Sequence, residues 1–144
     1  MSFVFDPSNA VHTRSLQRLD SEEVIWLVTS GRDGYPHAVP VWFLWRDGRA
    51  IIMSEPKTAK VANIRADDKV ALHLEAGEDG EQLTVLRGVA TISDEPAAAW
   101  VPRIEEEYTA KYDVLLQRLD LTTTTMADRY STVIEMTPHK LIAW

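Results

Sequence analysis

The chain has 144 residues, a length that suits a single domain spanning residues 1–144 with its own hydrophobic core. It carries 22 acidic against 15 basic side chains, a net charge of −7, which argues against a nucleic-acid-binding function. Cysteine is absent, which excludes disulfides, thiolate metal sites and a cysteine nucleophile.

The first half of the chain reads as one helix followed by short strands. Its opening residues have no basic, apolar leader, and no stretch approaches the ~18 consecutive apolar residues of a membrane span, so we expect a soluble, cytoplasmic protein with no membrane partner. A helix capped by Ser8 is predicted first, because apolar residues then recur at helical spacing. Three strands with Asp-Gly turns between them follow. The predicted ranges are residues 8–19 for the helix and 24–29, 35–45 and 49–54 for the strands.

The second half mixes helices with further strands. The predicted helices cover residues 57–66, 95–119 with an interruption near Asp113, and a capped turn at 122–129. The predicted strands cover residues 69–76 and 82–93, then a closing pair, 131–136 and 140–144, around Pro138. A third Asp-Gly turn lies between the first two of these strands. Short strands joined by such turns favour an antiparallel β-barrel with peripheral helices.

The second predicted strand is apolar on both of its faces. Every residue from 38 to 45 is apolar, so one face can fill a barrel while the other needs a partner subunit or a flat ligand. Pro36 and Pro40 cannot donate to a strand ladder, which favours an edge or a bulge. A well-packed core strand at the centre of a monomer is the alternative interpretation.

A basic run follows the third predicted strand. Ser54 can cap a helix and Pro56 suits its first turn. Lys57 and Lys60 oppose the helix dipole unless an anion is present, and helical spacing places them on the side that faces the barrel. Together with Arg65 they indicate a phosphate site. A solvated basic helix face explains the run equally well.

Motifs of catalysis by the protein itself are missing. There is no nucleophile elbow, no Walker loop and no G-x-G-x-x-G sequence. The four histidines show no metal-ligand spacing, so no metal site is predicted, and only His37 and His73 could serve as axial ligands of a haem. An enzyme of this sequence would need a cofactor to supply the reactivity.

Four segments together resemble a known family. They are residues 33–43, 57–64, 70–73 and the closing strand pair 131–144. In order and spacing the chain resembles the pyridoxamine-phosphate-oxidase-like, FMN-binding split-barrel superfamily, and within it the small branch of probable coenzyme F-420-dependent oxidoreductases. The resemblance implies a mainly β, antiparallel split barrel with peripheral helices that works as a homodimer.

The resemblance also implies a cofactor site at the dimer interface. The ring would lie against the second strand, the phosphate at the end of the third strand and the following helix, and the C-terminal strand would contribute its last residue. The implied cofactor-binding residues are Val39, Pro40, Val41, Trp42, Phe43, Met53, Ser54, Lys57, Thr58, Lys60 and Trp144.

A deazaflavin, coenzyme F-420, is the expected cofactor. The Ser-Arg-Lys run associated with true pyridoxamine phosphate oxidases is reduced here to Thr58-Ala59-Lys60, which favours the deazaflavin over FMN. The expected function is hydride transfer from the reduced deazaflavin to a small conjugated acceptor. An FMN-dependent oxidoreductase and a non-catalytic cofactor-binding protein are the alternatives, with haem binding a distant fourth.

Overall fold

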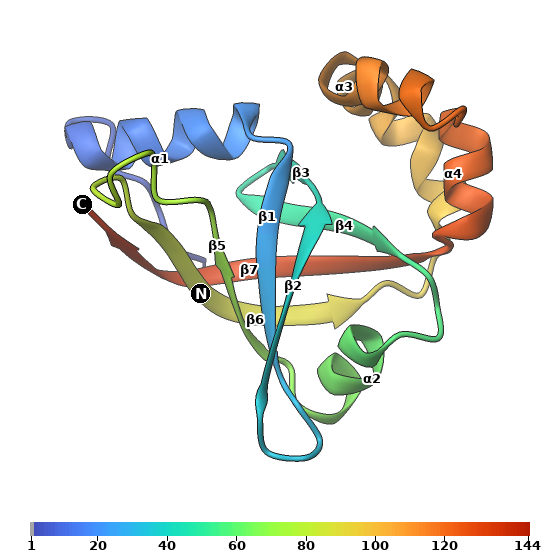
Figure 1. Cartoon of the computed structure of the whole chain (residues 1–144), viewed down its shortest axis with the longest axis horizontal. Coiled ribbons are helices and arrows are strands. Elements are labelled where there is room, and N and C mark those ends of the chain that lie inside the picture. The colour runs from blue at the N-terminus through green and yellow to red at the C-terminus, as the bar shows by residue number, and fades with distance from the viewer. Residues whose placement is uncertain (1) are drawn as a thin grey trace.

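Strong β-forming segments and tight turns give one curled antiparallel sheet. A computed structural model describes residues 2–144, and its seven strands pair in the order β2-β1-β5-β6-β7-β4-β3. The sheet curls until β2 contacts β4, and this confirms the mainly β, split-barrel architecture (Figure 1). The strands are β1 (Val24–Ser30), β2 (Pro36–Trp42), β3 (Leu44–Arg46), β4 (Arg49–Ser54), β5 (Lys69–His73), β6 (Thr84–Ile92) and β7 (Thr132–Ala143).

Four helices lie around the sheet. They are α1 (Ala10–Ser21), α2 (Ala59–Ala66), α3 (Ala97–Arg118) and α4 (Thr123–Arg129). Figure 1 shows α1 at one end of the molecule, α3 and α4 together at another, and α2 near the β1–β2 hairpin. No helix between residues 2 and 144 combines the length and the apolar character needed to cross a membrane.

The predicted strand 35–45 is two strands, β2 and β3, divided at Phe43. The main-chain groups of Phe43 bond to helix α3 instead of to a neighbouring strand. Its N–H donates to the Tyr112 hydroxyl over 2.9 Å, and its carbonyl accepts from Lys111 Nζ over 2.8 Å. The prediction of a continuous strand was wrong because α3 supplies these hydrogen bonds.

The predicted pair of closing strands is one strand, β7, which continues through Pro138. The register with β6 shifts between Arg87 and Gly88, and Pro138 lies opposite Gly88 at that irregularity. A Cβ atom at Gly88 would lie 2.0 Å from the Thr137 carbonyl oxygen, so only glycine permits this close approach. The bulge therefore accommodates the proline without ending the strand.

Several predicted helix boundaries also move. The cap of α1 is Asn9, whose Oδ1 accepts from Val11 N, while Ser8 bonds to Asp6. Helix α3 is continuous, and the exposed Asp113 accepts a bond from Gln117 one turn later. Helix α2 begins at Ala59, which leaves Lys57 outside it.

Two hydrophobic clusters form the core. The barrel cluster lies between the strands and helices α1 and α2 and comprises Leu19, Ile25, Leu27, Phe43, Trp45, Ala50, Ile52, Val61, Ile64, Val70, Leu72, Leu74, Leu86, Ala90, Ile134 and Met136. The helical cluster joins α3 and α4 to β3, β4 and β7 and comprises Leu44, Ile51, Ala97, Trp100, Ile104, Tyr108, Tyr112, Leu116, Met126, Ala127 and Val133.

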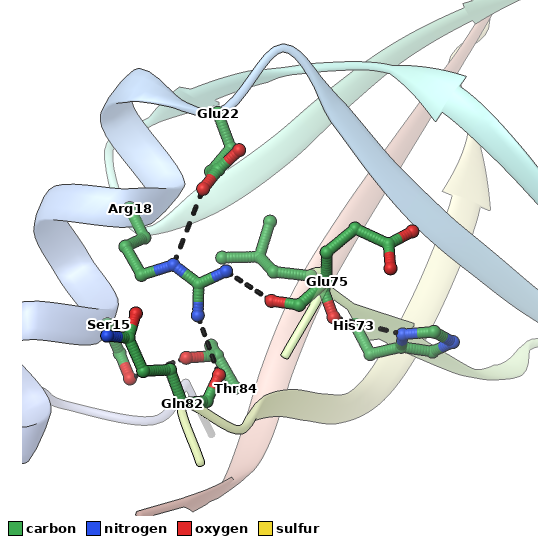
Figure 2. Close-up of polar contacts among 8 residues, drawn as sticks. Ser15, Arg18, Glu22, His73, Glu75, Gln82 and Thr84 are labelled. Carbon is green, nitrogen blue, oxygen red and sulfur yellow. Dashed lines mark hydrogen bonds and ion pairs between the residues drawn. The ribbon is translucent and has the colours of Figure 1, made fainter. Parts of the chain in front are cut away.

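Helix α1 is tied to the long loop between β5 and β6 by polar contacts. Figure 2 shows Arg18 bonded to the carbonyls of Glu75 and Gln82 and paired with Glu22 at 3.5 Å. Beneath it the buried hydroxyls of Ser15 and Thr84 lie 2.8 Å apart. The two Arg18 bonds satisfy loop carbonyls that no strand pairs, and the hydroxyl pair joins α1 to β6.

Candidate functional site

One cavity of about 380 Å³ lies where the sheet meets the α3–α4 layer. Its sheet wall comprises Val24, Pro40, Val41, Trp42, Met53 and Ser54. Its helical wall comprises Leu119, Leu121, Met126 and Tyr130, and helix α2 contributes Lys60. The walls are largely apolar, with Lys60 as the single ionic side chain of the lining, and the volume lies within the range of small-molecule sites.

The cavity runs beside the unpaired edge of β2. Within residues 2–144 this strand ends the sheet order and pairs only with β1, in line with the edge or bulge expected from the two prolines. Pro40, Val41 and Trp42 follow one another in sequence, and successive strand residues point to opposite faces. All three can line one cavity because it lies along the free edge of the strand.

The structure brings six of the eleven expected cofactor residues together in this lining. These are Pro40, Val41, Trp42, Met53, Ser54 and Lys60. The five others lie outside it: Val39 is half-buried, Phe43 is fully buried in the barrel cluster, Thr58 is half-buried, Lys57 is exposed, and Trp144 is exposed at the end of β7.

Sequence reasoning missed the whole helical wall and Val24. Leu119 and Leu121 flank Asp120 just after α3, and Met126 and Tyr130 lie one turn apart around α4. The available sequence signal for this wall was Leu119 and Leu121 on either side of Asp120. It does not distinguish a cavity rim from an ordinary helix connection.

The first turn of α2 forms a polar corner of the cavity. The Thr58 hydroxyl does not cap the helix; it donates to the Glu55 carbonyl over 3.3 Å and lies 3.2 Å from the Ser54 hydroxyl. The amides at the start of α2 therefore gain no bond from their N-cap side chain. Such amides attract anions.

Lys60 is the cation of this corner. Its side chain is half-buried, and burial lowers its pKa, an effect that the negative charge of Glu55 opposes. Within residues 2–144 its ammonium has no ion pair and no hydrogen bond. A half-buried cation without a partner fits an anionic group of a bound ligand. Lys57 faces solvent, so the expectation that both lysines face the barrel holds only in part.

Helix α3 holds Trp42 of the sheet wall in place. The ring of Tyr112 stacks on Trp42 with centroids 4.7 Å apart, and its hydroxyl bonds to Phe43 and to the Glu23 carbonyl. Lys111 Nζ lies 3.6 Å from the centroid of the Phe43 ring. Burial raises the pKa of Tyr112 and lowers that of Lys111 to about 8.

The comparisons with known proteins give the chain a family. A model described as pyridoxamine 5'-phosphate oxidase matches residues 13–144. The chain belongs to this family. No curated protein matches its sequence.

Solved structures share the fold of this pyridoxamine 5'-phosphate oxidase family member at low identity. An F420 reductase is 21% identical with a TM-score of 0.64, covering 88% of this chain and 94% of that one. The heme storage protein HutZ from Vibrio cholerae is 12% identical, with a TM-score of 0.69 and coverage of 90% and 92%. An FAD-binding protein from Mesorhizobium loti is 17% identical, with a TM-score of 0.61 and 90% of each chain covered. At these identities the likeness concerns the fold alone.

The histidines of this family member do not form a joint ligand pair. His37 lies opposite Thr29 of β1, and His73 lies opposite Trp26. Thr29 and Trp26 are three positions apart, so the two histidines point to opposite faces of the sheet. One chain therefore cannot hold a haem iron between them. Across the described residues no group of three or more histidine, aspartate and glutamate side chains could hold a metal ion.

Proposed function

We propose that this pyridoxamine 5'-phosphate oxidase family member is an oxidoreductase that binds a deazaflavin, coenzyme F-420, in the cavity and reduces a small conjugated acceptor. The observation that carries the proposal is the partnerless, half-buried Lys60 at one end of an apolar cavity. A flavin-type cofactor combines a flat, largely apolar ring with an anionic tail, and this lining offers surfaces for both.

The residues of the cavity would divide the binding between them. Trp42, which Tyr112 of α3 holds in place, and Val41 would contact the ring of the cofactor. Lys60 and the first amides of α2 would bind the phosphate. The further expected residues Ser54, Lys57 and Thr58 would assist at this corner. When bound, the cofactor supplies the hydride; the protein residues orient it and exclude water.

FMN is the second candidate cofactor. The family model and the FAD-binding protein of similar fold support a flavin, and the same residues could bind its ring and phosphate. The F420 reductase of similar fold supports the deazaflavin. A protein that binds the cofactor without turnover is a further outcome that the experiment below must separate.

The proposal includes a second copy of the chain. Cross-strand register sets Trp26, His73, Val85 and Ile142 in one row on the sheet face opposite the barrel cluster, and all four are only half-buried. Pro40 continues this row and lines the cavity. A partner covering this face would reach the site, and sedimentation velocity tests whether the chain is a dimer.

The test is a titration of the purified protein with coenzyme F-420 and, separately, with FMN, followed by fluorescence. Lys60→Gln should weaken binding of the true cofactor by roughly ten- to a hundredfold, because a charge-assisted contact is lost. Arg32→Gln, which removes an exposed cation from the β1–β2 turn outside the cavity, is the control and should bind as the wild type does.

The outcomes separate the alternatives. Tight F-420 binding followed by hydride transfer to a panel of conjugated acceptors supports the leading proposal, and preferential FMN binding supports the second candidate. Tight binding without transfer to any acceptor leaves a binding protein. Wild-type protein that binds neither, or Lys60→Gln that binds unchanged, would overturn the cofactor assignment.

A further inference from the structure

The turn between α3 and α4 is built to a fixed geometry. Asp120 adopts the left-handed conformation, with φ of 55°. The N–H of Leu121 donates to the Leu116 carbonyl over 2.8 Å, and the N–H of Asp120 donates to that of Gln117 over 3.1 Å. These two bonds make a Schellman motif, which ends α3 at a defined angle.

The next helix begins with an equally defined cap. The Thr125 N–H donates to the Thr122 hydroxyl over 3.1 Å, and the Thr122 N–H donates to the Thr125 hydroxyl over 2.8 Å. Leu121 is the last residue of the Schellman motif and directly precedes this capping box. Both sides of the turn are therefore held, and its two leucines present a fixed apolar edge to the cavity.

The chemistry of the helical wall differs from that of the α2 corner. Leu119, Leu121, Met126 and Tyr130 carry no ionic group, and Lys60 is the one ionic side chain in the entire lining. Leu119 is 57% exposed at the cavity, although a leucine there gains little from folding alone. A ligand that covers Leu119 would bury this exposed apolar surface, which favours binding.

We propose that the helical wall binds an uncharged, flat, apolar substrate, with Leu119 and Leu121 as specificity-determining residues. The inference rests on the proposed function for the location of the cofactor on the sheet wall. Because the cofactor's anionic tail would use Lys60, a charged substrate would lose its water shell against the helical wall without gaining a partner. An uncharged aromatic compound has no such penalty.

The experiment measures binding by calorimetry with two flat probes of matched size, neutral naphthalene-2-carboxamide and anionic naphthalene-2-sulfonate. Wild-type protein saturated with whichever cofactor it binds should prefer the carboxamide. Leu119→Lys should weaken carboxamide binding about fivefold, because part of a leucine contact is lost, and should strengthen sulfonate binding. The preference between the two probes should thus shift by at least about tenfold.

Val114→Lys is the matched control, because Val114 is 60% exposed on α3 and does not line the cavity. It should leave the preference unchanged, and Leu119→Gln should weaken carboxamide binding without strengthening sulfonate binding. An unchanged preference in Leu119→Lys, or an equal shift in Val114→Lys, would overturn the inference.

The same experiment separates this inference from the cofactor proposal. If the protein binds neither F-420 nor FMN but Leu119→Lys still shifts the probe preference of the free protein toward the sulfonate, the cofactor proposal fails and the apolar site stands. If a cofactor binds and neither probe does, the cofactor proposal stands and the substrate inference fails.

Discussion

The barrel cluster and the helical cluster are both buried, but they hold the molecule together in different ways. The barrel cluster is mostly aliphatic and follows the in–out alternation of the strands. The helical cluster contains Trp100, Tyr108 and Tyr112, and the Tyr112 hydroxyl bonds to main-chain groups at the division between β2 and β3. The first cluster stabilises the fold, and the second in addition sets the shape of the cavity.

The largest effect is expected in the barrel cluster. Leu72 lies on β5 with none of its surface exposed. Leu72→Ala should lower the free energy of unfolding by about 2–5 kcal/mol, because a cavity remains where the side chain packed. Urea unfolding followed by circular dichroism measures it.

The cofactor affinity of the same variant distinguishes the roles of the two clusters. The folded fraction of Leu72→Ala should bind the cofactor with wild-type affinity, because Leu72 does not line the site. Leu16→Ala on α1 is the control, because this leucine is 37% exposed and lies outside both clusters. A strong loss of cofactor affinity in Leu72→Ala would show that the barrel interior shapes the cavity too.

A smaller loss of stability, but a larger change at the site, is expected for Tyr112→Phe. The substitution keeps the ring that stacks on Trp42 and removes the hydroxyl that accepts from the Phe43 N–H. A buried N–H without an acceptor costs about 1–3 kcal/mol, measured by urea unfolding. The near-ultraviolet circular dichroism and the cofactor affinity should change together, because a shift of the Phe43 main chain also moves the neighbouring Trp42 ring.

Tyr108→Phe is the matched control in the same helix. Tyr108 is as deeply buried, but its hydroxyl makes no hydrogen bond to any other described residue. Its loss should leave stability, spectrum and binding close to those of the wild type. Equal effects in the two variants would mean that Tyr112 acts only as a packing residue.

Most of the sheet was predictable from the sequence. The strand at residues 24–29, predicted from its β-branched and aromatic side chains, the Asp47-Gly48 turn with positive φ at both positions, and the bounds of β4 are local properties and were confirmed. Pro36 and Pro40, which carry no N–H for a ladder, predicted an edge or a bulge, and β2 is an edge strand.

The failures in the sheet and at the site share one physical cause, which is that distant segments supply the deciding contacts. The division at Phe43 depends on side chains 68 and 69 positions later in the chain. The continuity of β7 through Pro138 depends on the absence of a side chain at Gly88 on another strand. Lys60 and Leu119 meet at one cavity only because the sheet curls and α3 returns across it. No local pattern contains that information.

A dependence of stability on pH is expected from the charge that α3 places against the barrel cluster. Burial lowers the pKa of Lys111 to about 8, although Asp20, Glu22 and Glu23 oppose the shift. Its pKa in the unfolded chain is near 10.5, so between pH 8 and 10.5 the unfolded state binds more protons and the free energy of unfolding rises with pH.

Lys111→Met removes this titration. The wild-type value minus the Lys111→Met value, from urea unfolding at pH 7, 8, 9 and 10, should therefore stay level up to about pH 8 and then increase. A difference that stays level up to pH 10 would mean that the ammonium beside Phe43 keeps its water, and the helical cluster would then differ from the barrel cluster only in its hydroxyl bonds.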